Sequence, residues 1–299
     1  MARAPLASGV WGVVATPFSG STLDVDHGSL ARLVEHYEEI GVAGLTVLGV
    51  FGEAAQLATV ERRAVLETVV EAVKLPLVVG ATSLGTAPVI EEVRLTQEAV
   101  GDRLAGVMVQ VNSSNPDTLG RHLRAISEAT GADIVVQDYP LISGVTITAD
   151  ALIAAIRPLA FILGVKAEAP PTVVAVATLT AALDVPVFGG LGGIGLLDEL
   201  AVGSAGAMTG FSYPEGLIAC VDAWNEGGYD AARAAFLPYM PLVNFEQQAK
   251  VALAIRKECL RLRGLMIESS VRPPAASMPE ALMGQLRRHL KSMPHGEVA

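Results

Sequence analysis

Short apolar runs rich in β-branched residues recur along the chain at intervals of about 25 to 35 residues. Between them, apolar residues fall at helical spacing, and several of these segments begin near Ser, Thr or Pro and end at Gly. Near-continuous apolar strands that alternate with helices indicate a parallel sheet covered on both faces. The runs lie at residues 10–18, 44–49, 75–82, 106–111, 133–140, 161–166, 185–190 and 206–210.

Eight repeats of strand and helix are the number that closes a barrel, so the pattern predicts a (β/α)8 TIM barrel. The alternative is a doubly wound open sheet, which usually carries a Gly-rich dinucleotide fingerprint after its first strand. This chain has Thr16-Pro17-Phe18 there instead. The 299 residues fit one such barrel with an appendage, and they also fit two average domains.

The strand pattern stops near Gly228, and apolar residues then recur three and four positions apart, as in amphipathic helices. We therefore expect a barrel over residues 1–227 and a C-terminal helical extension over residues 228–299. Because no low-complexity linker separates the two, the extension should pack on the barrel.

Composition and charge narrow the class of partner. Hydrophobic residues make up 51% of the chain and charged residues 17%, which is below the roughly one quarter typical of soluble domains. This balance suits much buried strand and a subunit interface, so an oligomer is expected. The net charge of −10, without a basic cluster, argues against a nucleic-acid partner and leaves a small molecule as the default.

No uncharged stretch reaches the roughly 18 to 20 apolar residues of a membrane span, so no membrane partner is expected. The first apolar run ends in Pro17-Phe18 rather than in a small-residue cleavage site, which favours a strand over a signal peptide and predicts a cytoplasmic protein. Cys220, Cys259 and the five histidines have no metal-ligand spacing. We expect no metal and no cofactor.

The apolar run at residues 161–165 ends in Lys166, and a lysine ammonium is costly to bury without a partner. In a (β/α)8 barrel the active site lies at the carboxyl ends of the strands. An apolar pocket there favours the neutral amine, a nucleophile that forms an imine with a ketone. The alternative is a salt-bridged lysine at the barrel rim.

Glu168 follows Lys166 by two residues and shares its face if the strand continues that far. It would then place an acid/base within reach of the imine carbon. Alternatively, Glu168 is a favourable charge at the start of the helix that Pro170 and Pro171 introduce. The residues alone leave both interpretations open.

Five segments occur in the order and spacing of the dihydrodipicolinate synthase and N-acetylneuraminate lyase family: ATPF (15–18), GVFGEAAQL (49–57), QDYPLISG (137–144), GVK (164–166) and GSAGAMTG (203–210). The chain resembles this family over about residues 8–265, and no single motif carries the likeness. In that family the lysine on strand six forms a Schiff base with a 2-oxo acid, usually pyruvate. The resemblance implies this role for Lys166, and it implies a homotetramer built as a dimer of dimers, although a dimer suits the sequence equally well.

Two motifs depart from the family pattern. Family aldolases usually carry Gly-Thr-Thr-Gly-Glu after strand two, whereas this chain has GVFGE at residues 49–53 and lacks both hydroxyls. They also carry Tyr-Asn-x-Pro on strand five, where this chain has Gln137 at the place of the relay tyrosine and Tyr139 two residues later. A glutamine amide transfers no proton at neutral pH. Proton transfer is therefore expected at Glu168, with Tyr139 as an alternative, and dihydrodipicolinate synthase and sialate lyase activities are disfavoured.

The branch that dehydrates L-2-keto-3-deoxyarabonate is more similar. It is similar at VQDYPLISG (136–144), at Lys-x-Glu on strand six and at a segment like GAMTGFSYPEGL (206–217). The likeness implies that Lys166 forms the Schiff base, Glu168 acts as the acid/base and Gln137 holds the substrate. In that branch a serine follows the phenylalanine, whereas Gly52 follows Phe51 here.

Other strand ends supply the expected pocket. Ser83 is an alternative to Glu168 as the group that protonates the leaving C4 hydroxyl. The glycines after strand seven either hold a phosphate or allow tight turns and a close approach to the ligand. The expected substrate-binding residues are Gly49, Val50, Phe51, Gly52, Ser83, Gly190, Met208 and Thr209.

The leading hypothesis is a Schiff-base lyase that dehydrates a 2-keto-3-deoxy sugar acid. The second is a pyruvate-dependent aldolase, which differs in whether the enamine loses water or meets an aldehyde. A third is a non-catalytic barrel that binds an oxo acid, since the hydroxyl relay is absent. A nucleotide-dependent oxidoreductase is poorly supported because no phosphate-binding fingerprint is present.

Overall fold

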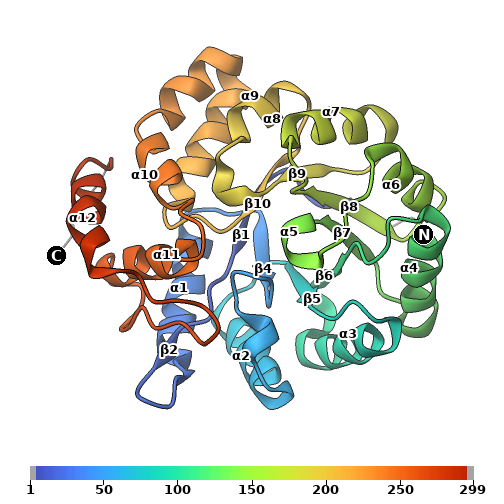
Figure 1. Ribbon diagram of the computed structural model, residues 1–299, viewed down its shortest axis with the longest axis horizontal. Helices are drawn as coiled ribbons and strands as arrows, with labels where there is room; N and C mark the ends of the chain where they lie inside the picture. Colours follow the sequence, from blue (N-terminus) through green and yellow to red (C-terminus); the bar gives the residue numbers. More distant parts are fainter. Residues whose placement is uncertain (1–4, 295–299) are drawn as a thin grey trace.

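Eight parallel strands close into a barrel in the computed structural model, which describes residues 5–294 (Figure 1). β1 closes the ring by pairing with both β10 and β4. The order around the barrel is β1-β10-β9-β8-β7-β6-β5-β4. The predicted (β/α)8 barrel is confirmed, and the open-sheet alternative is wrong. The strands are β1 (Gly9–Val13), β4 (Gly44–Val47), β5 (Leu77–Ala81), β6 (Leu104–Gln110), β7 (Ile134–Asp138), β8 (Ile162–Ala167), β9 (Val187–Gly189) and β10 (Gly206–Thr209).

Helices follow the strands and cover the outside of the barrel (Figure 1). Polar side chains fix where some of them begin: Asp26 accepts from the Ser29 amide at 3.0 Å, and Asn115 accepts from the Thr118 amide at 3.0 Å. The barrel helices are α1 (His27–Glu39), α2 (Thr59–Ala72), α3 (Thr86–Val100), α4 (Pro116–Thr130), α5 (Pro140–Ser143), α6 (Ala149–Ile156), α7 (Thr172–Ala182), α8 (Leu196–Ala201) and α9 (Pro214–Phe236). Short 3-10 turns η1 (Ala54–Gln56), η2 (Gly101–Arg103) and η3 (Leu191–Gly193) and a hairpin of β2 (Phe18–Ser19) with β3 (Asp24–Val25) complete this part.

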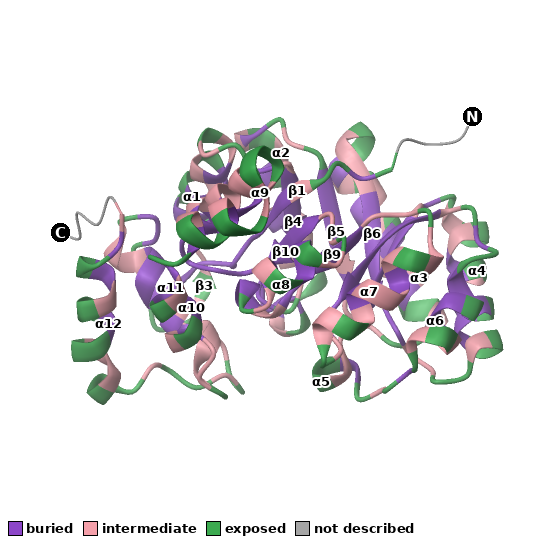
Figure 2. Ribbon diagram, turned by 90° about the horizontal axis from the view of Figure 1, so that it is seen from above, coloured by how far each residue is buried: buried purple, intermediate pink, exposed green. Residues whose placement is uncertain are grey.

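The strands bury both of their faces, which explains their nearly continuous hydrophobic sequences. Met108, Val135 and Phe188 belong to the cluster that fills the barrel. Their strand neighbours Val107 and Val136 belong to a second cluster, which lies beneath the surrounding helices. Figure 2 shows the resulting buried strands inside a shell of partly exposed helices. Polar residues are therefore exceptional on these strands and mark the site.

The chain bends within α9 at Gly228, whose φ of 70° is unfavourable for a residue with a Cβ. The predicted boundary between residues 227 and 228 falls at this bend. Ile255 and Cys259, both fully buried, join the extension to Leu217 of α9 in one apolar cluster. The extension consists of α10 (Met240–Phe245), α11 (Ala252–Leu262), η4 (Glu280–Leu282) and α12 (Met283–Lys291).

Candidate active site

Three polar side chains lie next to one another at the carboxyl ends of β6, β7 and β8. Gln110 is the register partner of Gln137, and Gln137 is the register partner of Lys166. All three are buried, with at most 7% of each residue exposed. Neighbouring residues in register point to the same side of a parallel sheet, so these three side chains form one row at the mouth of the barrel.

Lys166 and Glu168 face each other within this row. The Lys166 Nζ lies 3.2 Å from the Glu168 Oε2, and the two residues are 7% and 4% exposed. The Glu168 amide still donates to the Asp138 carbonyl at 2.9 Å, so the extended backbone continues past the end of β8. The Glu168 carboxylate therefore contacts the lysine rather than the start of α7.

Three donors hold the Glu168 carboxylate in place. Besides Lys166, the Gln137 Nε2 donates to Oε2 at 2.7 Å and the Leu191 amide donates to Oε1 at 3.3 Å. A Cβ at Gly190 would overlap the Glu168 side chain, so this position after β9 requires glycine. The predicted residues Lys166, Glu168, Gln137 and Gly190 are thus brought together. One carboxylate oxygen contacts both the Lys166 amine and the Gln137 amide.

The loop after β4 forms an apolar wall. The Gly52 amide donates to the Gly49 carbonyl at 3.0 Å, and the Thr16 hydroxyl donates to the Gly52 carbonyl at 2.6 Å. Phe51 is 8% exposed and packs against Gly210, where a Cβ would lie 2.6 Å from the ring. Val50 is 37% exposed. The loop therefore offers hydrophobic surface where relatives offer hydroxyls.

Asp138 and Tyr139 flank the site. Burial, and next the charge of Glu168, raise the pKa of Asp138 to about 6, and within residues 5–294 its Oδ1 has no hydrogen-bond partner. Burial also raises the pKa of the half-buried Tyr139, and the charges of Glu168 and Arg256 act on it in opposite directions. Tyr139 therefore lies close enough to Glu168 to interact electrostatically.

Three other predicted residues have different surroundings. The Ser83 hydroxyl donates to Glu92 at 2.5 Å, and Glu92 also pairs with Arg62 at 3.2 Å, so the structure joins Ser83 to this cluster and not to Lys166. Met208 is fully buried in the barrel. The Thr209 Oγ1 accepts from the Gly192 amide at 2.6 Å, which makes Thr209 a support for the loop after β9.

A cavity of about 530 Å³ opens at the same end of the barrel. The carboxyl ends of β4 to β7 supply Val50, Thr82, Gln110 and Ile142, and the extension supplies Leu253 and residues 274–276. The Gln110 Oε1 is buried without a hydrogen-bond partner among the described residues. Gln110 is not among the residues predicted from the sequence, although it ends the apolar run GVMVQ, the same signal that identified Lys166.

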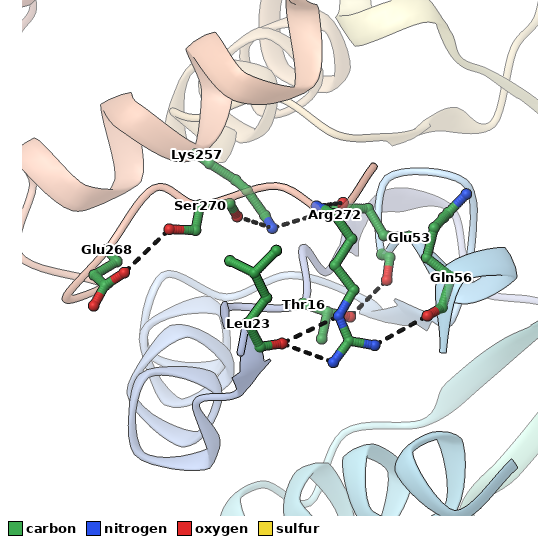
Figure 3. A network of polar contacts seen from close by, with 9 residues as sticks. Thr16, Leu23, Glu53, Gln56, Lys257, Glu268, Ser270 and Arg272 are labelled. Atoms are coloured by element: carbon green, nitrogen blue, oxygen red, sulfur yellow. Dashed lines mark hydrogen bonds and ion pairs between the residues drawn. The ribbon is translucent and has the colours of Figure 1, made fainter. Parts of the chain in front are cut away.

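The extension is anchored to the loop after β4. The buried Lys257 ammonium pairs with Glu53 and donates to the Ser270 carbonyl at 2.7 Å (Figure 3). The Arg272 amide donates to the other Glu53 oxygen at 2.8 Å. The Arg272 guanidinium donates to the Leu23 carbonyl at 2.7 Å, so the segment after α11 also binds the β2–β3 hairpin. Burial lowers the pKa of Lys257 to about 8, and Glu53 opposes this shift.

Residues 5–294 contain no cluster of three or more His, Cys, Asp or Glu side chains placed to hold a metal ion. Nor do they include a helix with the length and apolar character needed to cross a membrane.

The barrel thus carries a buried lysine on its sixth strand, paired with a carboxylate at the barrel mouth, as expected for a (β/α)8 lyase that works through a lysine Schiff base. The family model described as the dihydrodipicolinate synthetase family matches residues 6–293. The chain belongs to this family.

Relatives from several organisms cover nearly the whole chain. L-2-keto-3-deoxyarabonate dehydratase from Azospirillum brasilense is 29% identical over 286 residues, which are 92% of this chain and 90% of that protein. 4-Hydroxy-tetrahydrodipicolinate synthase from Synechococcus sp. (strain CC9902) is 30% identical over 289 residues, covering 94% and 93%. The crystal structure of dihydrodipicolinate synthase from Rhodopseudomonas palustris matches with a TM-score of 0.88 and 30% identity, covering 97% of this chain and 99% of that one.

Proposed function

We propose that this protein dehydrates a 2-keto-3-deoxy sugar acid through a Schiff base at Lys166. One observation carries the proposal: the Glu168 carboxylate, 3.2 Å from the Lys166 Nζ, is held by Gln137 at the position where family aldolases use a tyrosine relay. The site thus has an acid/base beside the amine and a non-ionising amide in place of the relay. The relative from A. brasilense is an L-2-keto-3-deoxyarabonate dehydratase, whose substrate belongs to this class.

The proposed reaction begins when the Lys166 amine attacks the C2 carbonyl and water leaves to give the imine. Glu168 accepts a proton from C3, and the electron pair of that C–H bond forms the enamine. The enamine then expels the C4 hydroxyl, which leaves as water with the proton that Glu168 returns. Hydrolysis of the imine consumes the water released in the first step, so the net change is the loss of one water per substrate.

Gln137 and Gln110 orient the reactants. The Gln137 Nε2 fixes the Glu168 oxygen that faces the amine. The Gln110 carbonyl oxygen, which has no partner among the described residues, can accept from a substrate hydroxyl. Ser83 is not needed as the proton donor, because its hydroxyl is engaged by Glu92.

A pyruvate-dependent aldolase is the second candidate. Tyr139, which interacts with Glu168, is the observation that favours it, since a tyrosine there can relay protons to an incoming aldehyde. Incubation with 2-keto-3-deoxypentonates and hexonates separates the two activities. A dehydratase forms a product lighter by one water and releases no pyruvate, whereas an aldolase releases pyruvate.

Borohydride trapping tests the covalent step. We expect a mass adduct on Lys166 with pyruvate and with a 2-keto-3-deoxy sugar acid. Tight binding of either compound without an adduct would instead indicate a non-catalytic oxo-acid-binding barrel.

We also propose that the protein is a cytoplasmic homotetramer. Large apolar side chains exposed on the single chain, among them Leu141 at 80% and Val174 at 61%, support burial in an assembly. Light scattering coupled to gel filtration measures the mass; a monomer would contradict the assembly.

A further inference from the structure

Arg256 extends from α11 to the loop that follows β9. Its Nε donates to Glu246 at 3.2 Å, and its guanidinium carbon lies 5.8 Å from the centre of the Phe51 ring. A Cβ at Gly192 would lie 2.5 Å from the Arg256 Nη2, so the guanidinium rests directly on this loop. In the part of the chain that the structure describes, neither Nη atom has a hydrogen-bond acceptor. The outer edge of the guanidinium is therefore free to bind a ligand.

Gln247 brings a second donor to the same place. Its Nε2 would also overlap a Cβ at Gly192, which puts it beside the Arg256 guanidinium. This nitrogen is buried and has no partner among residues 5–294. Buried amide donors are rarely left unpaired in proteins, because they lose their bonds to water without replacement. Two unpaired donors thus converge above one glycine.

Gly192 lies in the loop after β9, and this loop also contacts Glu168, so the position of the Arg256 and Gln247 donors can be related to the reacting carbons. The Leu191 amide binds the Glu168 Oε1, whereas the Lys166 Nζ faces the Glu168 Oε2. The loop after β9 therefore lies on the side of Glu168 away from the lysine. A substrate joined to Lys166 at C2, with C3 at Glu168, extends its C4 and later carbons toward this loop.

We propose that Arg256 and Gln247 form a subsite that binds oxygen acceptors at the end of the 2-oxo acid remote from the Schiff-base carbon. The inference rests on the proposed function, because it places the C2 carbon at Lys166. The acceptor is a hydroxyl or a second carboxylate. The guanidinium fork binds a carboxylate through two parallel bonds, and the amide serves either group.

Neighbouring contacts fix the direction of Arg256. Glu246, which accepts from its Nε, is fully buried and also accepts from the Ser212 hydroxyl. The next residue, Lys257, is bound to Glu53 and the Ser270 carbonyl. A buried carboxylate thus holds the guanidinium through its Nε, and the contacts of the next residue hold this part of α11 against the barrel.

The test compares two ligands in one assay. Half-saturation of borohydride trapping at Lys166 is measured with pyruvate, which has no remote end, and with a 2-keto-3-deoxy sugar acid. In Arg256→Gln we expect half-saturation with the sugar acid to rise at least about tenfold while that with pyruvate stays within about twofold. Gln247→Leu should act in the same direction with a smaller effect. Arg288→Gln, an exposed site on α12 with the same change of charge, should leave both values unchanged.

Two results would overturn the subsite. If Arg256→Gln weakens the trapping of pyruvate and of the sugar acid equally, Arg256 binds the C1 carboxylate instead. If the trapping of both is unchanged, Arg256 does not bind the substrate. If Arg256→Gln fails to fold, Arg256→Lys keeps the charge but loses the fork and takes its place in the assay. Wild-type protein that is trapped by the sugar acid but does not dehydrate it would contradict the proposed function alone, because trapping does not require dehydration.

The preference of the enzyme between two substrates identifies the group that the subsite binds, a terminal hydroxyl or a terminal carboxylate. The wild-type ratio of half-saturation for a 2-keto-3-deoxy aldonate and the aldarate of equal carbon number reports the preference for a terminal hydroxyl or carboxylate. In Arg256→Gln this ratio should move toward one. An unchanged ratio would contradict the assignment of Arg256 to the remote end.

Discussion

Lys257 and Glu53 lie 204 residues apart in the chain, yet their side chains form an ion pair that is almost fully buried. The lysine Nζ also lies 4.3 Å from the centre of the Phe18 ring. Glu53 directly follows Gly49–Gly52, which form the apolar wall of the site. The pair therefore makes the geometry of the site depend on the C-terminal extension.

Removal of one partner should be far more costly than removal of both. Lys257→Met leaves the Glu53 carboxylate buried without its cation, and we expect the free energy of unfolding to fall by about 3–5 kcal/mol. The double variant Lys257→Met/Glu53→Gln should recover most of this loss, because the neutral amide can still accept from the Arg272 amide. Urea unfolding of both single variants and the double variant measures the coupling, and additive losses would contradict it.

Substitutions at Lys166 and at Glu168 should impair different steps of the reaction: the first abolishes the covalent step, and the second slows proton transfer. Lys166→Arg keeps a cation beside Glu168 but should give no borohydride adduct and no turnover. Glu168→Gln should still be trapped by pyruvate, while dehydration falls by about 10²–10⁴-fold, because the general acid/base is lost. Single-turnover kinetics with mass detection distinguish the two variants. Full dehydration by Glu168→Gln would assign proton transfer to another group, with Tyr139 as the first candidate.

Gly190→Ala should impair catalysis by displacing the acid/base. The new methyl group would overlap the Glu168 side chain, so we expect at least about a tenfold loss of turnover while pyruvate trapping persists. Gly284→Ala is the matched control, because a Cβ there meets no atom within 4 Å. Equal turnover in the two variants would show that the position of Glu168 is not critical.

Asp138→Asn should stabilise the protein at high pH only. Burial and the charge of Glu168 raise the pKa of Asp138 from 3.8 to about 6. A carboxyl group with a raised folded-state pKa contributes stability below about pH 4, and this contribution is lost as the pH rises through about 6. Asparagine does not ionise, so the Asp138→Asn variant avoids this loss. Its free energy of unfolding should exceed that of the wild type by about 2 kcal/mol near pH 8 and by little near pH 4.

Thermal unfolding across this pH range checks the prediction for Asp138. A gain of the same size at every pH would attribute the effect to packing rather than to the charge. The family pattern Tyr-Asn-x-Pro places an asparagine at this position, so the substitution is compatible with the fold.

The barrel was predictable because alternating strands and helices leave a periodic trace in the sequence. Lys166 was predictable because a charge at the end of an apolar strand is conspicuous. The partners of each side chain left no such trace: the pairing of Ser83 with Glu92 depends on the angle between β5 and α3. Likewise, Arg256 and Gln247 look like ordinary polar residues of amphipathic helices, and only the packing of the extension brings them to the barrel mouth.

The end of the chain shows the same limit. The sequence predicted a helical extension over residues 228–299 but did not locate α12 within it, although Leu286 and Leu290 of this helix are fully buried. Its apolar stripe is too short to predict a helix with certainty, since short helices depend on tertiary packing.

The anchoring of Glu53 by the extension has a consequence for synthesis on the ribosome. A nascent chain that has emerged as far as Thr209 contains every strand of the barrel, but neither Lys257 nor Arg272 has yet been translated. Until both arrive, the carboxylate behind the substrate wall lacks its cation and must stay hydrated. The buried carboxylate beside the apolar wall therefore gains its cation only when the final helices dock.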